Sequence, residues 1–295
     1  MPSMTEIQQI IDNDKHSLLA YADSDYLKRA PAFHWQNVRF YPDITNSQFI
    51  VFGEMLNQSG GTRLGVAGNR HPRPGKHFKK VQDGERVQLH LALGKIHSGN
   101  AELNGIWDKQ LIKLYDIQGT HNQQDVEART FPKRAVSLIQ PYISNGEIFD
   151  NITISWDKFR TPSSSTDIVS TLCEELAAPD KLWAPSDRDG YTKDYFDLKN
   201  DCVIQPAIYD VNNRLIPTHR LHEHLPPKTL VSALVMLDYK NIWFDPFDTT
   251  KGFWRQYDLK GISAKIMHVS DEPFETPSAP FIPSSARRAL NSSIN

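Results

Sequence analysis

The sequence predicts a mostly β protein of the α+β class whose strands are antiparallel. Several segments alternate apolar and polar residues with a period of two, and short segments rich in turn-forming residues separate them. The clearest of these is residues 86–96, in which a leucine occupies every second position from Leu89 to Leu93. Such alternation is typical of a strand with one face on a core and the other toward solvent or a ligand.

The remaining elements follow from the same patterns. Strands are also expected at residues 37–43, 47–56, 109–117, 151–159, 202–211, 229–244 and 261–269. Residues 4–29 place Ile7, Ile10 and Ile11 at helical spacing, which predicts a helical N-terminus. A second helix is expected over residues 167–177, because the preceding TPSSSTD segment offers capping residues.

A chain of 295 residues has room for one large domain or two of ordinary size, and two are favoured. The expected division is an N-terminal helical segment, a first β domain with a basic loop, a second, OB-like β domain, and an extended tail rich in Pro and Ser. These parts span residues 1–30, 31–160 (basic loop 55–82), 161–270 and 271–295.

The composition is that of an ordinary soluble protein, with 39% hydrophobic and 23% charged residues. No apolar run approaches the roughly 20 residues that cross a bilayer, and the N-terminus lacks the layout of a signal peptide. An intracellular location, in the cytoplasm or nucleus, is therefore expected. The net charge of −2 does not favour a polyanionic partner, so whether such a partner can bind depends on local clusters of positive charge.

One such cluster lies between Glu54 and Asp83, where no acidic residue occurs but six Lys or Arg, two His and five Gly do. The glycines and prolines make a core element implausible, and connections of this length are usually functional or disordered. Guanidinium groups and exposed backbone amides suit phosphate oxygens. The segment contains no Walker A motif, because His77 follows Gly75-Lys76 in place of Ser or Thr. A solvated loop that is simply positive is the competing interpretation.

Aromatic residues form a second cluster. Residues 239–257 hold seven aromatics, interleaved with Lys240, Lys251 and Arg255. Rings beside cations are what single-stranded nucleic acid requires, because bases stack on the rings and a positive groove follows the backbone. Strands are also rich in aromatics for packing reasons alone, so a structural role for these rings stays open.

The segment PTHRLHEHLPP carries His219, His222 and His224, whose spacing makes them weak candidates for a metal site. The H-E-x-x-H order is absent, and Pro226-Pro227 stops a helix from continuing through the segment. No G-x-S-x-G, C-x-x-C or G-x-G-x-x-G motif is present, so no catalytic residue is assigned and no cofactor is expected. The chain is expected to be a binding protein rather than an enzyme.

Together these features favour an OB-like barrel that binds single-stranded nucleic acid with low sequence specificity, DNA ahead of RNA, in replication or recombination. The pattern is strongest over residues 225–269, where a strand, an aromatic and basic loop, a Gly-containing turn and a second strand follow one another. The expected interface is Arg63, Arg70, Arg73, Lys76, Lys79, Lys80, Trp107, Trp243, Lys251, Phe253, Trp254 and Arg255.

Two alternatives remain open at this point. A capsid-type assembly protein would share the strands and the basic arm, and would form a large homo-oligomer. A metal-dependent hydrolase would use His219, His222 and His224.

Overall fold

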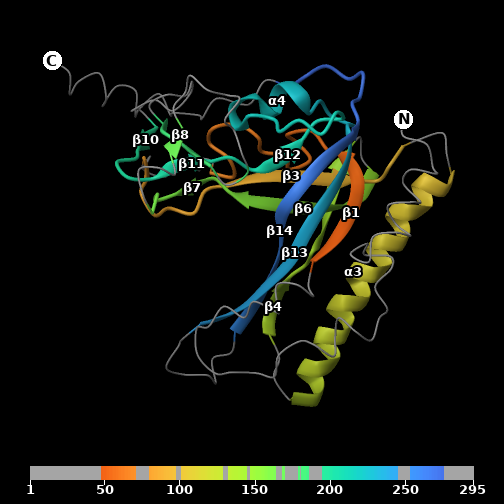
Figure 1. Cartoon of the computed structure of the whole chain (residues 1–295). Helices are drawn as coiled ribbons and strands as arrows, with labels where there is room; N and C mark the ends of the chain where they lie inside the picture. The colour runs from red at the N-terminus through yellow and green to blue at the C-terminus, as the bar shows by residue number, and fades with distance from the viewer. Residues whose placement is uncertain are drawn as a thin grey trace.

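Strands dominate the fold, which confirms the predicted mostly β, antiparallel-rich class. The computed structural model describes residues 48–70, 80–97, 101–128, 132–144, 147–163, 168–169, 179, 181–185, 195–244 and 253–275. The main sheet is built on five strands (Figure 1): β1 (Gln48–Met55), β3 (Gln88–Gly94), β6 (Glu147–Asp157), β13 (Leu230–Trp243) and β14 (Phe253–His268).

These five strands pair in a cycle that returns to its first member. β1 pairs antiparallel with β3 and with β13, β3 pairs antiparallel with β6, and β13 pairs antiparallel with β14. The cycle is completed where β14 runs parallel to β6, with Leu259 beside Ile154. This contact spans two residue pairs, as does the β1–β3 contact, so the five strands form a partly open barrel of the predicted OB-like kind.

The barrel has an apolar interior because its strands alternate apolar and polar residues. On β3 and β6 the aliphatic and aromatic side chains at alternate positions point into one core, and β13 and β14 contribute theirs from the opposite wall. That core includes Leu89, Leu91, Leu93, Ile152, Ile154, Trp156, Val231, Ala233, Val235, Leu237, Tyr257 and Leu259.

Smaller elements extend and flank the barrel. β12 (Ala207–Tyr209) and β4 (Pro132–Val136) each pair parallel with β14, and β5 (Ile139–Ser144) pairs antiparallel with β6. A second sheet contains β7 (Phe159–Arg160), β11 (Cys202–Ile204), β9 (Leu182–Trp183) and β8 (Ile168–Val169), and β10 (Phe196–Asp197) pairs with β2 (Val81–Gln82). The helices are α3 (Ala101–Ala128), the 3-10 helix η4 (Thr218–Arg220) and the one-turn α4 (Leu221–His224).

Helix α3 fills the gap that the short β1–β3 contact leaves in the barrel. Gln110 of this helix accepts a hydrogen bond from the Phe52 backbone N–H (2.7 Å) and donates one to the Phe52 carbonyl (2.9 Å), so its amide replaces a missing strand partner. Trp107 packs so closely that a Cβ on Gly53 would lie 2.9 Å from its ring. Within the described residues, no helix combines the length and apolarity that a membrane span requires.

The structure corrects two of the predicted elements. Residues 109–117 were expected as a strand and lie in α3. The helix expected over residues 167–177 is contradicted at its start, where Ile168 and Val169 form β8 beside β9. The predicted N-terminal helix (4–29) and the strand at 37–43 lie outside the described residues, as does the tail beyond residue 275.

Strands from both sides of residue 160 belong to the one barrel. β1 and β6 precede this position, and they pair with β13 and β14, which follow it. The sequence division at residue 160 therefore passes through the middle of the barrel's strand order.

Candidate nucleic-acid interface

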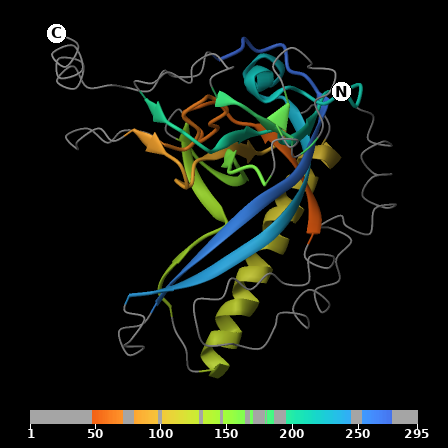
Figure 2. The same cartoon turned by 60° about the vertical axis from the view of Figure 1, so that its left-hand side comes forward.

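The β13–β14 hairpin continues past the barrel as an arm. Below the β6 contact at Leu259, the two strands stay paired down to Trp243 and Phe253. β4 joins this arm on its other edge, running parallel to residues 253–256 of β14. The arm projects away from the barrel on the side where the C-terminal half of α3 also extends (Figure 2).

Alternation along the arm separates structural from available side chains. Phe253, Arg255 and Tyr257 are buried, whereas Trp254 and Gln256 between them are half-buried. The Arg255 guanidinium lies 5.6 Å from the centre of the Phe253 ring, which makes this pair part of the packing of the arm. Trp254 is therefore the aromatic ring of this part of β14 that is partly accessible to solvent.

The arm also gathers cations that the sequence-based interface omits. The β4 backbone carries Lys133 and Arg134, and Arg134 is the register partner of Trp254. On the opposite edge, Lys240 of β13 pairs with Gln256. A short basic run in the sequence, with Arg129, Lys133 and Arg134 within six residues, is the signal that could have identified this strand.

The described part of the basic segment lies against the barrel. Residues 57–70 run along the edge of β3 opposite β6, where Arg63 and His90 exchange backbone hydrogen bonds and the Asn69 N–H donates to the Gln88 carbonyl. Asn151 of β6 donates its side-chain amide to the Gly60 carbonyl at 3.5 Å. The face of β3 and β6, which binds ligands in other OB folds, is thus partly covered by this segment.

Both described arginines of the segment contact protein groups. The Arg63 guanidinium donates to the carbonyls of Gln58 and Thr62, the latter at 2.7 Å. Arg70 forms an ion pair with Glu85. Lys80 is half-buried. Arg73, Lys76, Lys79 and Lys251 lie outside the described residues, and for Trp243 only the backbone is described.

A buried lysine anchors the same segment from below. Lys158 follows β6, and its Nζ donates to the Gly65 carbonyl at 3.0 Å. Burial lowers the pKa of this amine from 10.5 to about 7, because removal from water disfavours the charged form. The loop is therefore fixed by side chains of the barrel as well as by its own backbone contacts.

Carboxylates lie beside two cations of the barrel, Arg86 and Lys260. Arg86 lies 3.8 Å from Asp157 and 3.7 Å from Asp258, and Lys260 lies 3.1 Å from Asp238. These carboxylates offset the cations beside them, so this part of the barrel has little net attraction for phosphate.

Trp107 has no place in an interface. Only 2% of its surface is exposed, and its ring is part of the main core beside Gly53. Phe253 and Arg255 are also almost fully buried. Of the expected interface residues, the structure places Phe253, Trp254 and Arg255 together on the arm with the Trp243 backbone, and places Arg63 and Arg70 in the covering segment.

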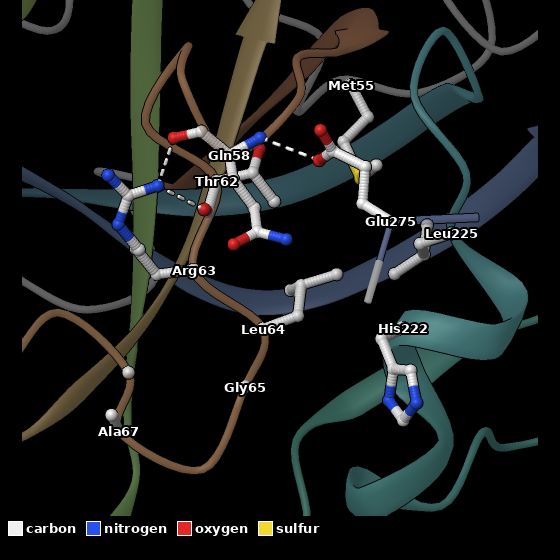
Figure 3. A pocket seen from close by; sticks show the side chains of 11 residues that line it. Met55, Gln58, Thr62, Arg63, Leu64, Gly65, Ala67, His222, Leu225 and Glu275 are labelled. Carbon is white, nitrogen blue, oxygen red and sulfur yellow. Dashed lines mark hydrogen bonds between the residues drawn. The ribbon is translucent and has the colours of Figure 1, made fainter. Parts of the chain in front are cut away.

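A small pocket opens between the covering segment and α4 (Figure 3). Leu64 and Leu225 supply apolar surface, and His222 lies on the α4 side. Glu275 enters from the end of the described chain and accepts a hydrogen bond from the Gln58 N–H at 2.7 Å. The Glu275 carboxylate thus joins the end of the described chain to the covering segment.

The three histidines do not converge on a common point that could hold a metal. In the described part of the chain, no three His, Cys, Asp or Glu side chains are grouped so that they could share an ion. His219 lies in η4, and His222 and His224 lie in α4, where Glu223 forms an ion pair with Arg220 at 2.8 Å. The geometry gives no support to a hydrolase built on these residues.

Comparisons with known proteins give likeness only to solved structures. No family model matches the sequence, and no curated protein matches it. The chain is similar to gp2.5, a single-stranded DNA binding protein encoded by bacteriophage T7, with a TM-score of 0.36 and 9% identity over 77% of this chain and 90% of that one. It is also similar to the single-stranded DNA-binding protein from bacteriophage Enc34 in complex with ssDNA, with a TM-score of 0.34 and 11% identity over 78% and 90% of the two chains.

Proposed function

We propose that this protein binds single-stranded nucleic acid, DNA in preference to RNA, with low sequence specificity, along the β13–β14–β4 arm and the adjoining edge of the OB-like barrel. The observation that carries the proposal is the arm itself. It places the half-buried Trp254 between a strand with Lys133 and Arg134 and a strand with Lys240 and Trp243.

This arrangement supplies the two interactions that single-strand binding needs, base stacking and attraction of the phosphates. An aromatic face is worth about 1–3 kcal/mol for each stacked base, and it accepts any base because every base has a π-face. Cations on the neighbouring strands suit the phosphates that connect those bases. From Phe253 to Lys260 the strand spans about 23 Å, at roughly 3.3 Å per residue, which is long enough for several nucleotides.

The proposed residues differ in role. Trp254 is the proposed stacking ring, with Trp243 as a second ring across the hairpin. Lys133, Arg134, Lys240 and Lys251 are the proposed phosphate contacts. Arg73, Lys76 and Lys79 remain proposed contacts of the basic segment, on sequence grounds. Lys80 is also a proposed phosphate contact of this segment. Arg63 and Arg70 could contact phosphate only if it replaced their present protein partners.

Fluorescence anisotropy with a labelled thirty-nucleotide single strand tests the proposal. Trp254→Ala is expected to weaken binding by about 5- to 150-fold, the loss of one stacked base. The control is Phe274→Ala, because Phe274 is an exposed aromatic residue that lies outside the arm, near the end of the described chain. Unlabelled DNA, RNA and duplex competitors rank the preferred ligand.

Salt dependence tests the cations separately. The double variant Lys133→Ala/Arg134→Ala is expected to reduce the slope of log K against log salt by about 1.4, or 0.7 for each phosphate lost. Arg214→Ala, in the exposed turn after β12, is the control and should leave the slope unchanged. The proposal fails if the wild-type protein does not bind the strand at low salt, or if binding ignores salt.

A further inference from the structure

The β5–β6 hairpin carries the apolar face of the barrel beyond the barrel itself. Ile152 and Ile154 of β6 point into the core, and alternation puts Ile148 and Asp150 on the same face of the strand. On β5, Ile139 lies opposite Ile152 and is buried, and Ile143 lies opposite Ile148 four residue pairs further along. Isoleucines thus continue along the core-facing side of β5 and β6 beyond the end of the core.

The continuation is exposed to solvent. Ile148 is 72% exposed and Ile143 is 69% exposed, although they face each other across the hairpin. Helix α3 borders the same region through Ile112 and Tyr115, which are 59% and 50% exposed and one turn apart. Burial, the Asp150 charge and a hydrogen bond to Asp150 all raise the pKa of Tyr115, so the tyrosine hydroxyl reaches the hairpin.

We call these exposed apolar residues of the hairpin and of the neighbouring turn of α3 the hairpin patch (Ile112, Tyr115, Ile143 and Ile148). Single exposed apolar residues are ordinary on protein surfaces, but contiguous apolar patches usually mark an interaction. Here the aliphatic pair lies on the strand face that also carries the buried Ile139, Ile152 and Ile154, with the half-buried Asp150 and the exposed Pro141 between them.

Strand addition is a poor way to cover it. β5 is the last strand of the sheet order, so its outer edge has no strand partner among the described residues. However, Pro141 lies in the middle of β5 and has no N–H to donate to an added strand. A helix with an apolar stripe, packed across the side chains, needs no hydrogen bonds from that edge.

The chain itself contains such a segment. Residues 4–29 place Ile7, Ile10 and Ile11 at the i, i+3, i+4 spacing of one helix face, and Leu18 and Leu19 follow two turns later. A helix of this length is marginal alone in water and gains its stability by packing its apolar face. In the sequence this segment lies just before β1.

Both β1, by which the chain enters the barrel, and β5 of the hairpin contact α3. β1 contacts one flank of α3, through the paired hydrogen bonds between Phe52 and Gln110, and β5 contacts the same helix. Crossing a helix requires about 10 Å, whereas the 18 residues from 30 to 47 reach up to about 60 Å when extended. The connection is therefore long enough, and it keeps the segment at a high local concentration.

We propose that the hairpin patch is the docking site for residues 4–29 of the same chain, which bind it as an amphipathic helix. The docked segment would cover Ile143 and Ile148 and pack against Ile112 and Tyr115. This would complete the open end of the β5–β6 hairpin, independently of any nucleic-acid binding by the arm.

Photo-crosslinking of the full-length protein tests the proposal. p-Benzoylphenylalanine replaces Ile148, and a mixture of ¹⁵N-labelled and unlabelled protein is irradiated and analysed by mass spectrometry. Crosslinks to residues 4–29 within one isotopic species are expected. The same probe in place of Val211, which is 44% exposed in the turn after β12, is the control and should not label this segment.

Hydrogen exchange gives the second measurement. The variant Ile143→Asp/Ile148→Asp changes two exposed positions and should fold normally, and it is expected to lower the protection of residues 4–29 by at least tenfold. Val211→Asp should leave that protection unchanged. Crosslinks that join two isotopic species, crosslinks to other segments, or the absence of crosslinks would each overturn the proposal, as would equal protection in both variants.

Discussion

Gly261 offers a sharp test of how the barrel closes. This glycine lies on β14 next to the β6 contact, at an irregularity in the register with β13. A Cβ at this position would lie 2.0 and 2.1 Å from two atoms of the Trp156 indole, well inside van der Waals contact. The sequence therefore needs glycine here because a large core ring lies directly on the backbone.

Gly261→Ala is expected to destabilise the protein by about 3 kcal/mol. Overpacking a core typically costs about 1–3 kcal/mol, and the upper end applies because Trp156 is buried and cannot move into solvent. In a urea titration this lowers the midpoint by about 1 M if the m-value is near 3 kcal/mol/M. The second variant Trp156→Phe removes the ring atoms that clash, so the double mutant should recover at least about 1 kcal/mol.

Gly119→Ala is the matched control for this variant. Gly119 is exposed in α3, and a Cβ there would meet no atom within 4 Å. The same substitution should therefore stabilise the protein by up to about 1 kcal/mol through helix propensity. A Gly261→Ala variant within about 0.5 kcal/mol of wild type, or a cycle with Trp156→Phe that shows no coupling, would refute the argument.

Two further predictions concern ionisable groups that hold loops. Because burial lowers the pKa of Lys158 to about 7, the unfolded chain binds more protons than the folded one between about pH 7 and 10.5. The free energy of unfolding should therefore rise with pH by up to about 1.4 kcal/mol per unit in this window, and Lys158→Met should remove this contribution; equal slopes in urea titrations of both proteins would contradict it. Burial acts to raise the pKa of Asp83, but hydrogen bonds from the backbone N–H groups of residues 199–201 and the Asn200 side chain together outweigh it and lower the pKa below 3.8. The hydrogen bonds between Asp83 and residues 199–201 should therefore persist at neutral pH and weaken as pH falls through the folded pKa of Asp83. Asp83→Asn should reduce the amide protection of residues 199–201 several-fold at neutral pH. Unchanged protection factors would disprove this prediction.

The strands were predictable where burial is one-sided. On β3 the alternation of Leu89, Leu91 and Leu93 with polar residues reflects one face on the core and one under the covering segment. The pairing of the strands was harder to predict from the sequence, because β1 pairs with β13 and β6 pairs with β14 across long stretches of chain. No local pattern specifies which distant strand completes a barrel.

Helix α3 shows why a short window misleads. Within residues 109–117, apolar and polar residues alternate well enough to resemble a strand. Over the whole helix, Leu111, Leu114 and Ile117 form the buried stripe at helical spacing, and Ile112 and Tyr115 are the exposed exceptions. The residues that broke the helical pattern are those of the hairpin patch, so the misassignment and the patch have one physical cause.

Composition could not distinguish a core ring from an available one. Trp107 and Trp254 both lie near cations in the sequence, yet Trp107 is buried in the core and Trp254 is half-buried on the arm. The difference arises from which face of its element each ring occupies, and this depends on tertiary contacts such as that between Trp107 and Gly53.

Counting charges along the chain also overstated the positive potential of the basic segment. Its acid-free interval ends at Asp83, but Glu85 lies just beyond it and forms an ion pair with Arg70. Arg63 is directed at the backbone carbonyls of Gln58 and Thr62. In the described part of the segment, the arginine side chains thus bind groups of the loop itself and Glu85, while backbone hydrogen bonds attach the loop to β3. On the arm, the β4 backbone lies beside β14 with Arg134 opposite the half-buried Trp254. The carboxylates beside the barrel cations are one reason why the proposed interface is placed on the arm rather than on the β3–β6 face.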